Sequence, residues 1–163
     1  MGSSPHAEIF YGVYLGAEGI WHNDDAYGDL PDILRDQEDM ENAQIKILDP
    51  GLVDPKWGSP QWDANYKRKR QIAGQVPLQV VSGGCFEYNT LDYNLVVKAS
   101  ITSTDWDSNP LSLASEPIMT MDPKALGWDA LLEEWANKLG IPWDKIVAAN
   151  PEGPRWMIVT STR

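Results

Sequence analysis

Residues 122–140 read DPKALGWDALLEEWANKLG, which is the strongest helix signal in the chain. Asp122 is suited to capping a helix and Pro123 to its first turn, while Gly140 ends it. Apolar residues recur at helical spacing along one face, namely Trp128, Leu131, Leu132, Trp135 and Leu139. The sequence therefore predicts a long amphipathic helix over Pro123–Leu139 that buries this face.

Several shorter stretches have the pattern of β-strands. Glu8–Leu15 is aromatic and β-branched, which is typical of a strand buried on both faces. Asp92–Ser100 alternates between apolar and polar residues. We expect its inward residues to be Tyr93, Leu95, Val97 and Ala99, and its outward residues to be Asp92, Asn94 and Lys98.

Two more strands complete the predicted sheet. Val76–Ser82, with Pro77 near its start, is expected to pair with the strand at Asp92–Ser100 as an antiparallel hairpin. The loop of this hairpin would hold Gly83, Gly84 and Cys85. Trp156–Thr160 predicts a terminal strand, preceded by a short helical turn over Pro142–Ala149.

The segment between the first strand and the hairpin is harder to interpret. Pro31–Asn42 predicts an acidic helix with a thin apolar stripe, followed by a short strand at Ile45, Ile47 and Leu48. A long irregular connection would follow, and the basic run Lys67–Arg70 is expected in a solvated loop or at a strand edge. A phosphate or partner contact is the alternative for this run.

These patterns together predict an α+β fold in a single domain over residues 1–163, with residues 1–6 frayed. A mainly antiparallel sheet of four or more strands would be packed by one long amphipathic helix and a shorter acidic helix. No apolar run is long enough to cross a bilayer, and the start of the chain lacks the features of a secretory signal. We expect a cytoplasmic protein that does not contact membranes.

The net charge of −11 is concentrated at one end of the chain. Residues 1–42 carry ten acids against one base, Arg35, a net charge of −9, while the rest carries fourteen acids and twelve bases. Such a balance repels phosphate backbones, so direct nucleic-acid binding is not expected.

Few residues are available for catalysis. His6 and His22 are the only histidines and Cys85 the only cysteine, which leaves no set for a catalytic triad or a zinc cage. We predict no enzymatic activity and no cofactor. A metal-dependent or thiol enzyme remains the alternative, based on Cys85 and on the Asp24–Asp25 and Asp105–Asp107 clusters.

Two groups of residues are candidates for binding a partner. Eight tryptophans are many for this length, and four of them are expected in loops: Trp21, Trp57, Trp62 and Trp106. Of these, Trp57, Trp62 and Trp106 are the candidate partner anchors. Asp32, Asp36 and Asp39 would lie on one face of the acidic helix, extended by Asp25 and Asp29. That row would imitate nucleic-acid phosphates; the alternatives are a solvated helix face and tryptophans that fold back over the core.

The order of the segments resembles a known group of proteins. It consists of Glu8–Gly16, an acidic loop, a turn with Cys85 that leads into Asp92–Val97, a Trp-bearing helix and a closing strand from Gly153. This order resembles that of the small acidic accessory proteins of tailed bacteriophages. Their pattern has a histidine beside the cysteine, where this chain has Gly84. The resemblance implies a phage origin and no particular activity.

The function expected from the sequence is therefore that of a phage accessory protein. It would bind and modulate or inhibit a host protein, with a nucleic-acid-binding protein of host defence or transcription as one option. The alternatives are the enzyme described above and a minor structural component of the virion.

Overall fold

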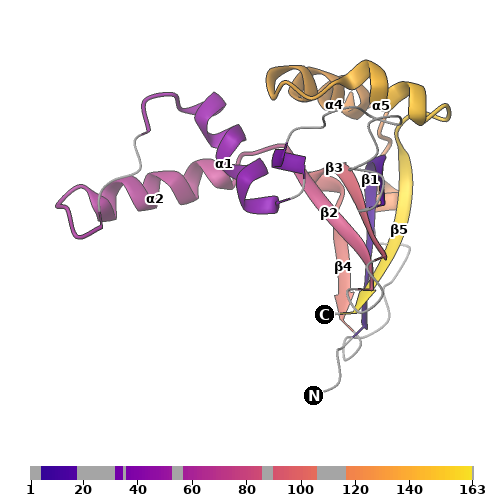
Figure 1. Cartoon of the computed structure of the whole chain (residues 1–163), viewed down its shortest axis with the longest axis horizontal. Helices are drawn as coiled ribbons and strands as arrows, with labels where there is room; N and C mark the ends of the chain where they lie inside the picture. Colours follow the sequence, from indigo (N-terminus) through magenta and orange to yellow (C-terminus); the bar gives the residue numbers. More distant parts are fainter. Residues whose placement is uncertain are drawn as a thin grey trace.

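The computed structural model describes residues 5–17, 32–34, 36–52, 57–85, 90–105 and 117–162. These residues form a five-stranded sheet and five α-helices (Figure 1). The strands are β1 (Pro5–Ala17), β2 (Leu78–Cys85), β3 (Thr90–Val97), β4 (Thr102–Asp105) and β5 (Arg155–Thr162). The helices are α1 (Gln37–Leu48), α2 (Trp62–Ala73), α3 (Pro117–Thr120), α4 (Trp128–Lys138) and α5 (Trp143–Ala149), with 3-10 turns η2 (Asp32–Leu34) and η4 (Lys98–Ser100). The expected α+β class with a mainly antiparallel sheet is confirmed.

The sheet is built around β1 and curls on itself. The strand order is β3-β2-β5-β1-β4, and β1 also pairs with β3. All of these pairs are antiparallel except β2 with β5, which are parallel and meet at Gly84 and Cys85. The pairings of β1, β5, β2 and β3 therefore close the sheet on itself. This closure brings Gly83 of β2 against Val159 of β5, where a Cβ on Gly83 would lie 2.8 Å from the Val159 Cβ.

The main core lies between one face of this sheet and the helices. Figure 1 shows α4 and α5 lying across one end of the sheet. Tyr11, Val13 and Leu15 of β1 pack in one cluster with residues of these helices, among them Leu132 and Ile146, which are fully buried. Burial of each such side chain is worth about 1.5–3 kcal/mol. A smaller cluster on the opposite face holds Phe10, Val81 and Val96.

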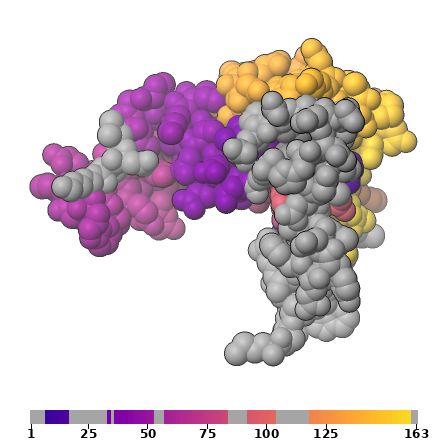
Figure 2. All heavy atoms as spheres, viewed as in Figure 1, coloured from indigo at the N-terminus to yellow at the C-terminus, as the bar shows by residue number. Residues whose placement is uncertain are grey.

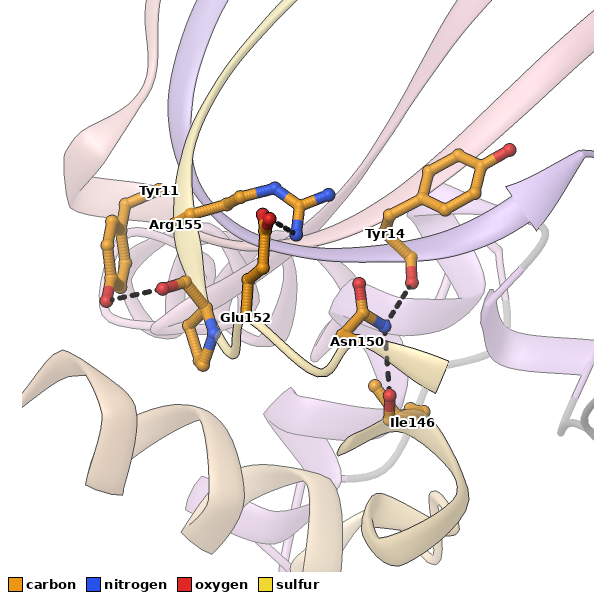
Figure 3. Close-up of polar contacts among 7 residues, drawn as sticks. Tyr11, Tyr14, Ile146, Asn150, Glu152 and Arg155 are labelled. Carbon is orange, nitrogen blue, oxygen red and sulfur yellow. Dashed lines mark hydrogen bonds and ion pairs between the residues drawn. The ribbon is translucent and has the colours of Figure 1, made fainter. Parts of the chain in front are cut away.

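Hydrogen bonds fasten the C-terminal helices to β1. Asn150 follows α5, and its Nδ2 donates to the carbonyl oxygens of Tyr14, at 2.8 Å, and Ile146, at 2.9 Å (Figure 3). The Tyr11 hydroxyl donates to the Asp129 carboxylate of α4 at 2.7 Å and lies 3.0 Å from the Pro154 carbonyl oxygen. Burial, and then the neighbouring Asp129, raise the pKa of the Tyr11 hydroxyl above its ordinary value.

The hairpin of β2 and β3 is confirmed, but three details differ from the sequence prediction. Asn94, expected outward, is 1% exposed, and its Nδ2 donates to the Val81 carbonyl oxygen, because both faces of β3 are covered. Ala99, expected inward, is exposed since the strand ends at Val97 and turns through η4. Gly83, Gly84 and Cys85, expected in the loop, belong to β2.

The ends of other elements also differ from the prediction. Pro5 and His6, expected to fray, pair with Thr162 and Ser161 of β5; residues 1–4 lie outside the described residues. The long helix begins at Trp128 rather than Pro123. The Asp122 carboxylate does accept from the Lys124 N–H at 3.0 Å, but the left-handed Gly127 (φ 69°) separates that turn from α4.

The largest errors fall between residues 31 and 73. The acidic helix begins at Gln37 rather than Pro31, and Ile45–Leu48 form its last turn instead of a strand. The connection expected to be irregular contains α2, so the basic run Lys67–Arg70 is helical. Asp36 explains the first shift, because its carboxylate caps α1 by accepting from the Glu38 N–H at 2.7 Å.

None of the helices in the described part of the chain is both long and apolar enough to cross a bilayer.

We predict that Gly12→Ala destabilises the fold by about 3 kcal/mol or more. A Cβ at Gly12 would lie 2.2 Å from the Leu95 carbonyl oxygen and 2.7 Å from the Val96 Cα, and these backbone atoms of β3 cannot move aside without breaking the sheet. Urea unfolding measures the change. Gly74→Ala is the matched control, since its nearest contact is an ordinary 3.4 Å; equal stability of the two variants would contradict the close crossing of β1 and β3.

Candidate functional site

The most distinctive part of the molecule is the α1–α2 arm, which we define as residues 36–52 and 57–75. Figure 1 shows α1 next to the sheet and α2 extending away from it, to the left of the strands. In the space-filling view the purple and magenta atoms of the arm form one end of the molecule (Figure 2). The arm therefore presents a surface of its own beside the compact body.

A buried glutamine fixes the arm to the sheet. The Gln44 side chain is 0% exposed and bonds both main-chain groups of Leu78 in β2. Its Nε2 donates to the Leu78 carbonyl oxygen at 2.8 Å, and its Oε1 accepts from the Leu78 N–H at 2.9 Å. We call this pair of bonds the Gln44 clamp. The clamp supplies the hydrogen-bond donor and acceptor that a neighbouring strand would otherwise provide for Leu78 at this edge of β2.

Two further contacts hold the base of the arm. The Gln37 Oε1 accepts at 2.8 Å from the N–H of Val80, which follows Leu78 on the same side of β2. The Lys98 Nζ donates to the Ala73 carbonyl oxygen at 2.9 Å, which ties the end of α2 to η4. Both helices are therefore anchored where they meet the body.

Helix α2 itself has no buried residue. Within the arm it is held to α1 by the ion pair between Arg68 and Asp49, 2.5 Å apart. It carries one acid, Asp63, and the four consecutive bases Lys67–Arg70. In an acidic chain, α2 is thus an exposed and locally positive helix.

Aromatic side chains line up along α2. The ring centroids of Trp57 and Trp62 are 4.8 Å apart at 79°, and those of Trp62 and Tyr66 are 5.1 Å apart at 8°. The Arg70 guanidinium follows, 5.8 Å from the Tyr66 ring centre. We call these four residues the aromatic ladder. Trp57 is 80% exposed and Tyr66 46%, so the ladder stacks on itself and not on the core.

A groove runs along the seam between the two helices. One cleft of about 400 Å³ and a second of about 290 Å³ share the lining residues Asn42, Leu52 and Lys69. The larger cleft has Glu38 and Glu41 on its α1 wall, and Trp62, Tyr66 and Arg70 on its α2 wall. Trp57 lines neither cleft. We call the two clefts together the seam groove.

The acidic row expected from the sequence does not form as one helical face. Asp36 is the N-cap of α1, and Asp32 belongs to the separate turn η2. Asp39 alone of the three lies within α1, exposed in its first turn. Asp25 and Asp29 lie outside the described residues. The row was predicted by assuming a helix from Pro31, and the N-cap at Asp36 breaks that assumption.

The tryptophans expected as partner anchors differ in where the structure places them. Trp57 and Trp62 come together in the ladder, although Trp62 belongs to a helix and not to a loop. Trp106, like Trp21, lies outside the described residues. Sequence reasoning missed Tyr66 and Arg70; their spacing from Trp62, at i+4 and i+8, was the signal that could have identified them.

Asp24, Asp25 and Asp107, on which the alternative metal site was based, lie outside the described residues. In the part of the chain that is described, no group of three or more His, Cys, Asp and Glu side chains lies close enough to hold a metal ion. The backbone of Cys85 pairs with Thr90 and Thr162 at the end of β2. No protein-family model matches this chain, and neither a characterised protein nor a solved structure matches it significantly.

We predict that Gln44→Glu destabilises the protein more at pH 8 than at pH 5, by at least about 1.4 kcal/mol, the equivalent of one pKa unit. Complete burial raises the pKa of a carboxyl above its unfolded value of about 4.3, and a protonated Glu can both donate and accept as Gln44 does. Stability is therefore retained at low pH and lost as the pH rises through the raised pKa.

Thermal or urea unfolding across this pH range measures the effect. The matched control is Gln71→Glu, because Gln71 is exposed on α2 and the same substitution there buries no charge. Equal pH dependence in the two variants would mean that Gln44 is not sealed from water.

Proposed function

We propose that this chain is a non-catalytic binding protein that docks a host protein through the aromatic ladder, with Trp57 as its anchor. The observation that carries the proposal is the exposure of Trp57, which at 80% is the highest among the large hydrophobic side chains of the described residues. An indole held in water is costly unless it is buried elsewhere. Tryptophan is also the residue type most enriched among interface hot spots.

Preorganisation supports the ladder as the docking surface. Trp57 rests edge-to-face against Trp62, and Trp62 is stacked on Tyr66 within a helix. Side chains already held in one arrangement lose little conformational entropy when a partner binds. The Gln44 clamp anchors the arm to β2, so the backbone of the arm also loses little conformational entropy when a partner binds.

The charge of α2 indicates the chemistry of the partner. Arg70 of the ladder and Lys67 of the same helix are both exposed, and the pair Arg68–Asp49 adds no net charge. The matching surface would be an apolar pocket for one indole, surrounded by Asp and Glu side chains. Such a partner meets the positive helix and avoids the acidic remainder of this chain.

A protein fits the ladder better than a nucleic acid does. Proteins that bind single strands offer open aromatic faces on which bases stack. Here the Tyr66 ring is already engaged by Trp62, which is stacked on it, and by the Arg70 guanidinium. The net charge of −11 also repels a phosphate backbone at long range.

The other expectations from the sequence remain separate proposals. A phage origin is based on the resemblance described above, and imitation of nucleic acid by the acidic first quarter needs a surface other than the helical row. A cytoplasmic location fits a host-protein target. No observation in the described residues favours a metal or thiol enzyme, or a virion component, over docking by the ladder.

We expect Trp57→Ala to weaken partner binding at least about 30-fold, since loss of a hot-spot residue costs about 2 kcal/mol or more. The immobilised full chain would capture its partner from nuclease-treated host lysate, and the affinity of the purified pair would be measured by calorimetry. The melting temperature of the variant should stay close to that of the wild type, because the indole is largely exposed.

Met119→Ala is the matched control, since Met119 is 66% exposed but belongs to α3, which is not part of the arm or of the ladder. A partner lost by Trp57→Ala and kept by Met119→Ala supports the proposal. A partner bound equally by both variants, or a captured nucleic acid in place of a protein, overturns it.

A further inference from the structure

Within the described residues, the seam groove is an open surface that is partly apolar. Leu52, Trp62 and Ala73 line the larger cleft, and Ile33, Ala43 and Ile45 extend the apolar lining into the smaller one. Two helices side by side cannot enclose a core of their own, and α2 accordingly buries none of its residues. Covering the groove with two further helices would complete a four-helix arrangement.

The two walls of the larger cleft carry opposite charges. Glu38 and Glu41 stand on the α1 wall, and Arg70 stands on the α2 wall. Among the described residues, none of these three side chains takes part in an ion pair. A partner surface of one charge sign would satisfy one wall and be repelled by the other.

A second copy of the same arm meets both requirements. In a contact with two-fold symmetry, each α1 faces the partner's α2, so every residue pair occurs twice. The acidic wall of one copy then faces the basic wall of the other on both sides of the axis. This complementarity follows from the chain's own residues and needs no other protein.

Long-range repulsion between the two arms themselves is small. The chain as a whole has a net charge of −11. By contrast, α1 carries three acids and one base and α2 one acid and four bases, which leaves +1 on the two helices together. With Asp36 and Asp49 included, the arm carries six acids and five bases, a net charge of −1, so only a small part of the chain's net charge lies where the two copies would meet.

We propose that the protein is a homodimer in which two α1–α2 arms pack across their seam grooves, with Glu41 of each copy facing Arg70 of the other. This inference goes beyond the proposed function: the dimer would cover Trp62, Tyr66 and Arg70 of the ladder, whereas the anchor Trp57 lies outside the groove and stays available to the host protein. The dimer would carry two Trp57 anchors, and a target with two matching sites would be held by avidity.

Sedimentation equilibrium of the full chain tests the dimer directly. The wild type should be dimeric at micromolar concentrations, and Arg70→Glu or Glu41→Arg should each weaken self-association at least about tenfold, since each places two like-charged pairs across the axis. An equimolar mixture of the two variants should form a heterodimer. On one side of its axis the two substituted side chains face each other with opposite charges, and on the other side the native pair of Glu41 and Arg70 is kept.

Two controls make each result decisive. Glu133→Arg reverses a charge on the exposed face of α4 and should leave the dimer intact, while circular dichroism checks that every variant is folded. Trp57→Ala should also dimerise normally while losing its host partner, which separates failure of this inference from failure of the proposed function. A wild-type protein that is still monomeric at roughly 200 µM overturns the proposal, because even a weak contact with a Kd near 0.1 mM would populate dimers at that concentration. Failure of the mixture to form a heterodimer also overturns it.

Discussion

The arrangement of this molecule depends on the two hydrogen bonds between the Gln44 side chain and the main chain of Leu78. Strand β2 meets β5 only at Gly84 and Cys85 in the described residues, so the earlier part of that edge needs other partners. Leaving buried N–H and C=O groups unpaired costs about 1–3 kcal/mol each. Gln44 satisfies both groups at Leu78, and Gln37 satisfies the next N–H at Val80. These bonds attach α1 to the edge of the sheet, and α2 is positioned through its contacts with α1.

The exposed features of the arm follow from that attachment. Because α1 uses its buried residues to pack against the sheet, little apolar surface is left to cover α2, which remains outside the core. The ladder and the seam groove are the apolar surfaces that result. One presents a single highly exposed indole, and the other presents a lined groove with oppositely charged walls. Trp62, Tyr66 and Arg70 belong to both surfaces, so a second copy at the groove would cover them. Trp57 lines neither cleft and would stay available to a heterologous partner.

The sequence was most informative where one periodicity was strong. The strand at Glu8–Leu15, the hairpin and the apolar face around Trp128 and Trp135 were predictable, because each buries a regular set of side chains. The arm was not predictable, because its order comes from contacts distant in sequence. Gln44 reads as an ordinary polar residue until Leu78 is placed beside it, and Asp36 ends the apparent helix from Pro31 by acting as its cap. The ladder was half predictable: Trp57 and Trp62 stood out, whereas Tyr66 and Arg70 join them only once α2 is helical.

Native-state hydrogen exchange of the Leu78 and Val80 amides tests the attachment of the arm most directly. Both N–H groups donate to glutamine side chains of α1 and not to a neighbouring strand, so their protection reports the clamp itself. If α1 is an integral part of the sheet edge, these two amides should exchange as slowly as those paired between β1 and β5. Exchange as fast as that of exposed turn amides would show that the arm detaches readily, and would contradict a rigid arm that presents the ladder and the groove.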